Sequence, residues 1–272
     1  MSASWDPDQY LRYGGERGRP FADLLSRIVH PDPRRVYDLG CGPGNTTSKL
    51  LERWPRARVT GIDNSPEMID HARALAVADR LDFRVEDLRD WKVDTPADVL
   101  MCCATLQWVP GHVDLLPGLV GSLAPGGVFA FQVPANFQQP SHTLLNELAT
   151  SDRWGERLGH LARPSPVLEP AGYLEALLAT GAGADVWETT YQHLLVGPDA
   201  VMEWARGTAL RPYLAALEEP GGGEGDAGEF LTAYSASLRA AYPRDSAGRT
   251  LFPFRRIFGI ATVAGGSGEV PS

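Results

Sequence analysis

The stretch VYDLGCGPGN spans residues 36–45 and decides the fold. An apolar run with strand character leads into a glycine turn, where the absence of side chains lets the backbone approach a ligand closely. The dinucleotide fingerprint G-x-G-x-x-G is not met, because Asn45 stands where its third glycine belongs and Gly44 comes one residue early. Asp38 at the strand end would repel a pyrophosphate, so the loop favours a cationic, nucleotide-like ligand.

Strand-like and helix-like segments alternate around this loop, as in βαβ units of a parallel sheet. Strands are expected at Arg35–Leu39, Ala57–Asp63, Asp82–Val85, Ala97–Cys103 and Val128–Val133. Helices are expected around Phe21–Ile28, over Thr46–Arg53, from Ser65 to an inward-facing Leu75, and over Asp114–Ser122, with a turn at 124–127. We therefore predict an α/β fold with a Rossmann-like, doubly wound, mostly parallel sheet.

The periodicity changes after Val133. Helices are expected at His142–Ala149, Pro170–Thr180, Asp199–Gly207 and Glu229–Ala241, and extended segments at Ala184–Tyr191 and Phe254–Val263. If both extended segments join the sheet, it has seven strands, and the helices inserted after the fifth and sixth form a lid over the carboxyl ends of the parallel strands.

From these expected elements we divide the chain into five parts. They are an N-terminal covering segment and helix at 1–33, a ligand-binding core at 34–134, a helical lid at 135–183 and 192–252, sheet strands at 184–191 and 253–264, and a disordered tail at 265–272. Within the lid, the glycine-rich run Gly221–Asp226 is expected to be a flexible connection.

Composition excludes several classes of partner. The chain of 272 residues carries 34 acidic and 25 basic residues, a net charge of -9, and has no basic tract, so we expect neither nucleic acid nor an anionic membrane as partner. We expect a cytoplasmic protein, because the first twenty residues lack the apolar core of a signal peptide and no apolar run approaches the roughly 20 residues that span a bilayer.

Metal binding and disulfides are not expected either. The three cysteines, Cys41, Cys102 and Cys103, are an odd count without metal-ligand spacing, and free thiols suit a reducing compartment. The histidines show no metal-ligand spacing. The sequence leaves the oligomeric state open.

Three acids end three successive predicted strands: Asp38, Asp63 and Asp87. Asp63 closes the second strand, where a carboxylate can accept hydrogen bonds from ribose hydroxyls. Asp87 closes the third and could accept from an adenine amino group, with the Leu88 backbone beside it. Any one of these acids alone could merely cap a loop or helix. All three together with the glycine loop indicate a nucleotide-like ligand.

The loop DLGCGPGN, followed by the segments Gly61–Asp63 and Glu86–Asp87, resembles the motif series of Rossmann-like S-adenosylmethionine-dependent methyltransferases. Further segments resemble the family of trans-aconitate 2-methyltransferases. They are Trp5–Pro7 with Tyr10, Glu16–Pro20, Leu106–Trp108, Trp187–His193, Gly207–Tyr213 and Phe252–Phe258. These segments are spread over nearly the whole chain and are more specific than the glycine loop, because the cofactor does not require them.

The resemblance implies S-adenosylmethionine as cofactor. By position, Asp38, Gly40, Gly42 and Gly44 would surround its methionine part, Asp63 and Asn64 its ribose, and Asp87 and Leu88 its adenine. It also implies that Cys103 lies beside the amino acid moiety. Relatives often carry asparagine there, and the alternative interpretation of Cys103 is a small buried residue at a strand end.

The resemblance further implies transfer of a methyl group to one carboxylate of trans-aconitate, or of a similar small tricarboxylate, with release of S-adenosylhomocysteine. A carboxylate with a pKa near 4 is already ionised at neutral pH, so we assign no catalytic residue and expect proximity to supply the rate. Planar, permanently charged arginines suit the remaining carboxylates. The candidate substrate-binding residues are Tyr10, Arg17, Arg19, Gln107, Trp108, Tyr191, Arg211, Tyr213 and Arg255, with Arg256 beside the last.

Three alternatives stay open at this point. The acceptor could be a malonyl group on a carrier protein or a natural-product acid, although an acidic chain argues against a basic docking patch for a carrier. The chain could be a non-catalytic S-adenosylmethionine-binding module. A nicotinamide-dependent dehydrogenase is least favoured, because of Asn45 and Asp38.

Overall fold

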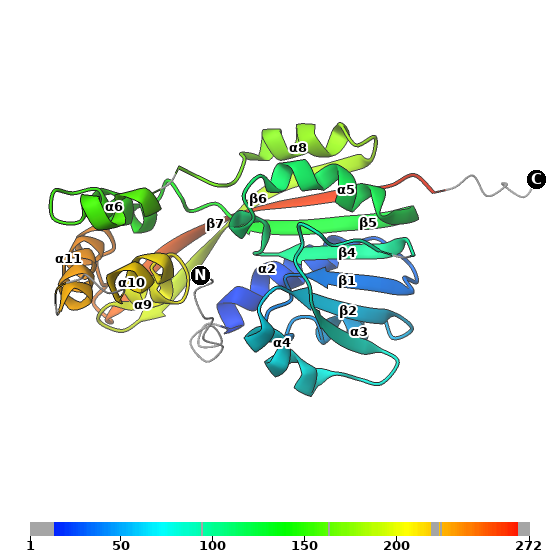
Figure 1. Cartoon of the computed structure of the whole chain (residues 1–272), viewed down its shortest axis with the longest axis horizontal. Coiled ribbons are helices and arrows are strands. Elements are labelled where there is room, and N and C mark those ends of the chain that lie inside the picture. The colour runs from blue at the N-terminus through cyan, green and yellow to red at the C-terminus, as the bar shows by residue number, and fades with distance from the viewer. Residues whose placement is uncertain (1–13, 94, 163, 219–222, 224, 266–272) are drawn as a thin grey trace, which may run out of the picture. The chain divides into compact units, whose positions relative to one another are not determined.

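The structure, a computed structural model, describes residues 14–93, 95–162, 164–218, 223 and 225–265 (Figure 1). The chain divides into two compact units. The sheet unit comprises described residues within 15–134, 167–189 and 256–265, and the helical unit those within 14, 135–166 and 190–255. Tyr10, residues 266–272 of the predicted tail, and residues 221, 222 and 224 of the glycine-rich connection lie outside the described residues.

Seven strands form one sheet in the order β3-β2-β1-β4-β5-β7-β6. They are β1 (Arg35–Leu39), β2 (Arg58–Asp63), β3 (Leu81–Val85), β4 (Ala97–Cys103), β5 (Leu123–Pro134), β6 (Gly183–Val196) and β7 (Arg249–Thr262). The pairs β1–β2, β2–β3, β1–β4 and β4–β5 are parallel, and β5–β7 is antiparallel. The predicted fold class is confirmed, because the parallel strands order outward from β1 in both directions and both late extended segments join the sheet.

Five α-helices belong to the sheet unit: α2 (Gly14–Arg27), α3 (Lys49–Arg53), α4 (Pro66–Ala72), α5 (Leu116–Gly121) and α8 (Pro170–Leu178). Short 3-10 turns in this unit are η1 (Arg73–Leu75), η2 (Leu106–Trp108) and η3 (His112–Leu115). The start of α4 follows from its sequence, since the Ser65 side chain accepts a hydrogen bond from the Met68 N–H and Pro66 occupies the first turn.

The predicted inward position of Leu75 is wrong, because its side chain is 39% exposed. Met68, Ile69 and Ala72 are buried as expected. The α-helix ends at Ala72 and continues as the 3-10 turn η1. A turn of three residues rotates the following side chains away from the face that an α-helical period would keep inward.

The predicted turn at 124–127 is also wrong, because these residues lie inside β5. Ala97 of β4 pairs with Leu123 and Val99 pairs with Val128, so β5 carries extra residues between two paired positions. Gly126 there has a φ of +78°, a backbone conformation that glycine adopts without strain. The Pro-Gly-Gly signal thus marks a bulge in a longer strand.

Helix α8 packs against α5 within the sheet unit, whereas the sequence grouped this segment with the helical lid. Tyr173 of α8 explains the attachment, since its ring lies 5.0 Å from that of Phe131 and its hydroxyl lies 2.7 Å from Nε2 of the buried His112. Both polar groups are thereby satisfied inside an apolar layer.

The helical unit is built from α6 (Pro140–Ala149), α7 (Gly155–Leu158), η4 (Gly159–Leu161), α9 (Ala200–Arg206), α10 (Arg211–Glu218), α11 (Asp226–Ala241) and the portions of β6 and β7 at 190–196 and 249–255. Its core is rich in aromatic residues, and the rings of Trp154 and Phe230 meet edge to face at 5.4 Å. Helix α10 was not among the expected helices; Pro212 is its second residue, and proline is tolerated in a first helical turn.

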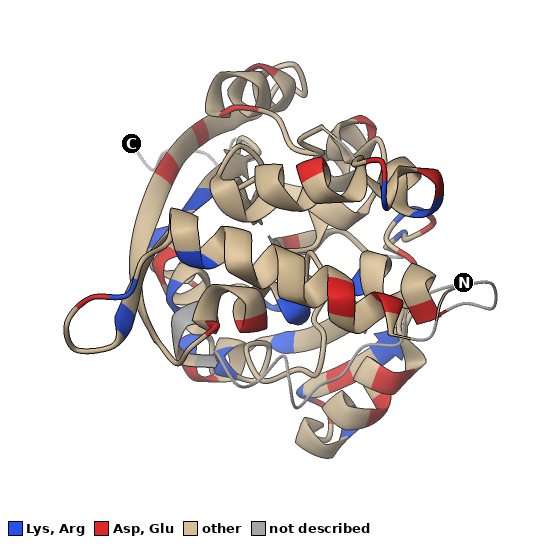
Figure 2. Cartoon of the chain, turned by 90° about the vertical axis from the view of Figure 1, so that its left-hand side faces the viewer, with Lys and Arg blue, Asp and Glu red and all other residues tan. Residues whose placement is uncertain are grey.

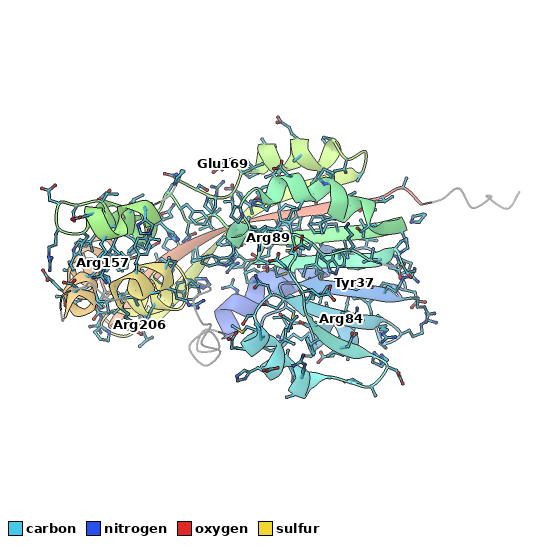
Figure 3. All side chains as sticks on the ribbon, viewed as in Figure 1. Tyr37, Arg84, Arg89, Arg157, Glu169 and Arg206 are labelled. Carbon is cyan, nitrogen blue, oxygen red and sulfur yellow. The ribbon has the colours of Figure 1, made fainter. Side chains whose placement is uncertain are left out.

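Acidic and basic residues are interspersed along the ribbons that face the viewer in Figure 2. One mixed cluster joins helices of this unit: Asp226 lies 3.0 Å from Arg153 and 3.2 Å from Arg157, which Figure 3 labels. In the part of the chain that the structure describes, every helix is too short or too polar to cross a bilayer.

We expect the His112–Tyr173 hydrogen bond to hold α8 on the sheet unit. Replacing Tyr173 with Phe leaves a buried imidazole without this partner, so the free energy of unfolding should fall by about 1–3 kcal/mol in urea titrations. In a double-mutant cycle, Tyr173→Phe should cost much less when His112 is already replaced by Phe. Equal costs in both backgrounds would contradict this role.

Candidate functional site

The glycine loop follows β1 directly; Gly40 and Gly44 are closely packed, and Gly42 is open. Gly40, Gly42 and Gly44 have positive φ angles of +78°, +54° and +82°. A Cβ on Gly40 would lie 2.0 Å from Oγ1 of Thr105, whereas a Cβ on Gly42 would meet no atom within 4 Å. The loop therefore packs tightly against the segment after β4 and leaves open space beside Gly42.

Asp38 stands in β1 just before this loop and is 2% exposed. Its Oδ2 accepts a hydrogen bond of 2.6 Å from the Thr47 hydroxyl. The pKa of Asp38 is raised to about 6, mainly by burial and also by the negative charge of Asp63, while the hydrogen bond from Thr47 opposes the rise. An ionised Asp38 is costly in this position, and a cation beside it would recover part of that cost.

Asp63 ties the end of β2 to the glycine loop. Its Oδ2 accepts from the Gly42 N–H at 2.9 Å and its Oδ1 accepts from the Ser65 N–H at 2.9 Å. Burial raises the pKa of Asp63, and these backbone hydrogen bonds oppose the rise. A carboxylate offers about four acceptor positions, so the same group can accept further hydrogen bonds from a ligand.

Asp87 follows β3 and is held by its neighbours. Arg89, labelled in Figure 3, donates to it from Nη2 at 2.6 Å and from Nε at 3.0 Å. The Arg89 hydrogen bond is the main reason that the pKa of Asp87 is lowered to about 2, and the exposed Asn64 side chain also hydrogen-bonds the carboxylate. The residues implied for ribose and adenine thus lie together, and Leu88 beside them is half-buried.

The segment after β4 borders the glycine loop. Cys103 is the last residue of β4, and Ala104 adopts a φ of +53°, which is unusual for a residue other than glycine. The Thr105 hydroxyl donates to the Gly40 carbonyl at 3.3 Å, and Nε2 of Gln107 donates to the Ala104 carbonyl at 2.6 Å. Oε1 of Gln107 is buried without a hydrogen-bond partner among the described residues.

The other residues of this segment are less constrained. Trp108 in η2 is 44% exposed, an unusual state for an indole.

All three cysteines are free thiols, and burial raises the pKa of Cys41, Cys102 and Cys103. Among the described residues no group of three or more His, Cys, Asp or Glu side chains could hold a metal ion.

The remaining substrate candidates are divided between the units. Arg17 and Arg19 lie in α2, where Arg19 is exposed and the Arg17 side chain is outside what the structure describes. Tyr191, Arg211, Tyr213 and Arg255 lie in the helical unit.

Within the helical unit, Arg211 and Arg255 are half-buried and Tyr191 is buried. The Arg255 backbone N–H donates to Oδ1 of the buried Asn136 at 2.6 Å. The Tyr213 hydroxyl lies 3.0 Å from Oδ1 of Asn146 and 3.1 Å from the Leu161 carbonyl. Tyr213 is therefore part of the core of the helical unit, where its hydroxyl joins α10 to α6 and η4.

Three polar residues of the site were missed by sequence reasoning: Thr47, Thr105 and Gln132. Nothing in the sequence pointed to Thr47 and Thr105. Their hydrogen-bond partners, Asp38 and Gly40, were expected to contact only the ligand. Gln132 was recognisable in the sequence, since it is the single polar residue in the apolar run Val128–Val133. In the structure it is 2% exposed. A polar side chain buried in a central strand requires a polar partner.

These features fit S-adenosylmethionine. The buried Asp38 and the half-buried Asp63, both with raised pKa values, favour a cationic ligand. The open side of Gly42 admits a close approach, and Asp63 retains acceptor capacity for hydroxyl groups. The seven-stranded sheet with this loop defines the class as an S-adenosylmethionine-dependent methyltransferase.

Comparison with known proteins supports this class and narrows it. Residues 36–127 match the methyltransferase domain family. A trans-aconitate 2-methyltransferase of Streptomyces coelicolor is 55% identical, covering 97% of this chain and 88% of the relative. Those of Streptomyces avermitilis and Mycolicibacterium gilvum are 54% and 48% identical, each covering 95% of this chain, with 96% and 99% of the relatives covered. The chain belongs to the trans-aconitate 2-methyltransferase family.

Solved structures of low sequence identity share the fold. The YcgJ protein from Bacillus subtilis has a TM-score of 0.56 at 16% identity, with 91% of this chain and 99% of that chain covered. The [4+2]-cyclase SpnF has a TM-score of 0.52 at 16% identity, with 91% and 81% covered. The fold alone therefore leaves the reaction undecided.

We expect the buried charge of Asp38 to destabilise the ligand-free protein. Because its pKa of about 6 in the folded state exceeds the ordinary 3.8, the folded state binds more protons, and stability falls as the pH rises from about 4 to about 6. Above pH 6 the cost is on the order of 3 kcal/mol.

The variant Asp38→Asn should therefore unfold several degrees higher than the native protein at pH 7.5, with the difference shrinking toward pH 4, as measured by calorimetry. It should also bind S-adenosylhomocysteine at least about tenfold more weakly in titration calorimetry. Asp152→Asn, at an exposed position, is the control and should change neither quantity. An unchanged ligand affinity in Asp38→Asn would contradict the assignment.

We expect Gly40→Ala to lower the free energy of unfolding by about 2–4 kcal/mol, because alanine is strained at this φ and its Cβ would overlap Thr105. Gly118→Ala, on the exposed face of α5 with no atom near the new Cβ, is the matched control and should be neutral or stabilising. Combining Gly40→Ala with Thr105→Gly should recover the steric part of the loss. A Gly40→Ala protein as stable as the control would refute the close packing.

Proposed function

We propose that the chain transfers a methyl group from S-adenosylmethionine to one carboxylate of trans-aconitate or a closely similar small tricarboxylate. The products are a monomethyl ester and S-adenosylhomocysteine. The observation that carries this proposal is sequence identity of 55% over 97% of the chain with a relative named trans-aconitate 2-methyltransferase. The matched region extends well beyond the glycine loop and includes the helical unit. The cofactor does not require the residues of that unit, so their similarity points to a shared acceptor.

We assign the cofactor-binding residues by their place on the sheet edge. Asp38 with Gly40, Gly42 and Gly44 would hold the methionine part, Asp63 and Asn64 the ribose, Asp87 and Leu88 the adenine, and Cys103 would lie beside the amino acid moiety. When bound, S-adenosylmethionine supplies an electrophilic methyl group on a positively charged sulfur. The contacts among Gly42, Asp63, Asn64 and Asp87 support this assignment, because they join the three strand ends.

The acceptor places simple demands on the protein. Its carboxylate is ionised at neutral pH and needs no general base. The side chains must hold the other carboxylates, exclude water and fix the line of attack, so alignment supplies most of the rate. We propose Arg17, Arg19, Arg211 and Arg255 for the carboxylates, Tyr10 and Tyr191 as hydrogen-bond donors, and Gln107 and Trp108 for the wall next to the glycine loop.

We further propose the helical unit, which carries Arg211 and Arg255, as the substrate-binding lid. Tyr213 supports this role indirectly, since its hydroxyl anchors the helix that begins at Arg211. We also propose a small acid as acceptor and a cytoplasmic location; the sequence has no basic tract that would serve as a docking patch for a carrier.

The second candidate is methylation of an acid tethered to a carrier protein or a natural product. A carrier domain is typically recognised through complementary charge. The interspersed charges of the helical unit in Figure 2 argue against it. A non-catalytic S-adenosylmethionine-binding role is the third.

Single-turnover mass spectrometry with methyl-labelled S-adenosylmethionine tests the proposal against a panel of acids. The panel contains trans-aconitate, cis-aconitate, citrate, isocitrate and a malonyl thioester. We expect a labelled monoester from trans-aconitate at the highest rate. Preferential labelling of the thioester would favour the carrier alternative, and binding of the cofactor without any labelled acid would favour a non-catalytic role.

A further inference from the structure

Thr47 lies in the turn before α3, and its hydroxyl is directed to the preceding strand. The side chain is completely buried, and Oγ1 donates a hydrogen bond of 2.6 Å to Oδ2 of Asp38 in β1. A hydroxyl at the start of a helix commonly accepts from the N–H groups of the first turn. Ser48, the N-cap residue of α3, makes no such bond, and its hydroxyl donates to the Asn45 carbonyl. The Thr47 hydroxyl therefore serves a carboxylate nine residues earlier and not its own helix.

Asp38 depends on this donor because its other surroundings offer little. In the register of the sheet, Asp38 is level with Gly61 of β2 on one side and with Met101 of β4 on the other, neither of which has a polar side chain. Only 2% of Asp38 is exposed to water. In the part of the chain that the structure describes, the Thr47 hydroxyl is the one side-chain donor to this carboxylate.

The titratable groups that interact with Asp38 are acids and thiols. Asp63 lies near enough for its charge to raise the pKa of Asp38. Burial raises the pKa of Cys41, Cys102 and Cys103, the charge of Asp38 adds to the rise, and all three thiols stay protonated at neutral pH. The other charged residues of α3 and of the strands beside Asp38 are exposed in α3 (Lys49, Glu52, Arg53) or lie near the starts of β1, β2 and β4 (Arg35, Arg58, Asp98).

The negative charge of Asp38 is therefore maintained at neutral pH by one hydrogen bond. A donor to a carboxylate stabilises the ionised form more than the neutral form. The pKa of Asp38, raised to about 6 mainly by burial, already includes the opposing effect of Thr47. The carboxyl group is thus mostly ionised at pH 7 with the donor in place, and without it the pKa would rise to neutrality or above.

We propose that Thr47 is a positioning residue for the methyl donor: its hydrogen bond keeps Asp38 negatively charged and so sets the lower pH limit of S-adenosylmethionine binding. This inference rests on the proposed function, in which Asp38 lies beside the methionine part of the cofactor. That part carries positive charge, so the ionised site binds it more tightly than the neutral one. Because a charge acts over several ångströms in a buried environment, Thr47 contributes without touching the cofactor.

The test is the Kd of S-adenosylhomocysteine as a function of pH, measured by titration calorimetry from about pH 5 to about pH 8.5. For the native protein we expect the affinity to fall as the pH drops through about 6, where Asp38 takes up a proton. Thr47→Val nearly keeps the shape of the side chain but removes the donor, so the midpoint should rise by about one to two pH units. At about pH 6.5 this variant should bind at least about threefold more weakly than the native protein, and at about pH 8.5 the two should agree within about twofold.

Three further variants separate this effect from a change in packing. Thr47→Ser retains the hydroxyl and should keep the native midpoint. Thr46→Val makes the same substitution one residue earlier in the same turn and should change neither the Kd nor the midpoint. In the Asp38→Asn background, which has no carboxylate at this position, Thr47→Val should no longer alter the pH dependence.

Carbon NMR of aspartate-labelled protein reports the protonation of Asp38 directly. The spectrum of Asp38→Asn identifies its signal by loss. We expect the native signal to titrate near pH 6 and to shift upward in Thr47→Val by the same interval as the midpoint of the Kd. Agreement between the two shifts would link the affinity to the charge of this one carboxylate.

A purely structural Thr47 would give a different pattern. Thr47→Val would then weaken binding by one factor at every pH and leave the titration of Asp38 unmoved, and that result would overturn the inference, as would a native affinity that stays constant while Asp38 titrates. If Thr47→Val does not fold, Thr47→Cys carries the test, because its weaker S–H donor should shift both midpoints upward by a smaller interval. If the protein binds S-adenosylhomocysteine but methylates no acid, the proposed function fails while these measurements still decide the role of Thr47. If it does not bind S-adenosylhomocysteine, both fail.

Discussion

Two neighbouring carboxylates beside one glycine loop, the buried Asp38 and the half-buried Asp63, determine how the rest of the site is built. Asp38 and Asp63 lie close enough that the charge of Asp63 raises the pKa of Asp38, and both are largely removed from water. The fold tolerates them because the Thr47 hydroxyl and the N–H groups of Gly42 and Ser65 donate to their oxygens. Each donor comes from the loop or helix that follows a strand, so the strand ends and the loop can only be built together. The remaining electrostatic cost is what makes the site selective for a cation.

The order of the strands separates acidic from basic residues along the sheet. Asp38 lies near the end of β1, Asp63 ends β2 and Asp87 follows β3, while the buried Arg256 stands level with the end of β5. An uncharged amide, Gln132, separates the guanidinium from Cys103 at the end of β4. The strand order thus places the acids on one side of β4 and the buried guanidinium on the other.

Much of the fold was accessible from the sequence, since apolar strands, glycine turns and a Ser-Pro helix start are local signals. The five parallel strands lie where the alternation put them, with β5 longer than expected. The errors share one cause, which is that distant packing overrides a local pattern. Leu75 turns outward once α4 tightens into a 3-10 turn, and the residues at 124–127 stay in β5 because Ala97 and Val99 of β4 pair with its two flanks. Helix α8 packs on the sheet unit because His112, 61 residues away, provides a partner for Tyr173.

The site was predictable to the extent that its residues follow strands. Asp38, Asp63 and Asp87 could be found because each ends an apolar run, whereas Gln132 could be noticed in its run but not understood without Arg256 across the strand pair. The protonation states of the histidines agree with a reaction that needs no general base. Burial lowers the pKa of His112 and brings that of His142 to about 4, so both are neutral at pH 7, and His112 is engaged with Tyr173. Because a carboxylate acceptor is already ionised at neutral pH, a titrating histidine is not needed as a general base.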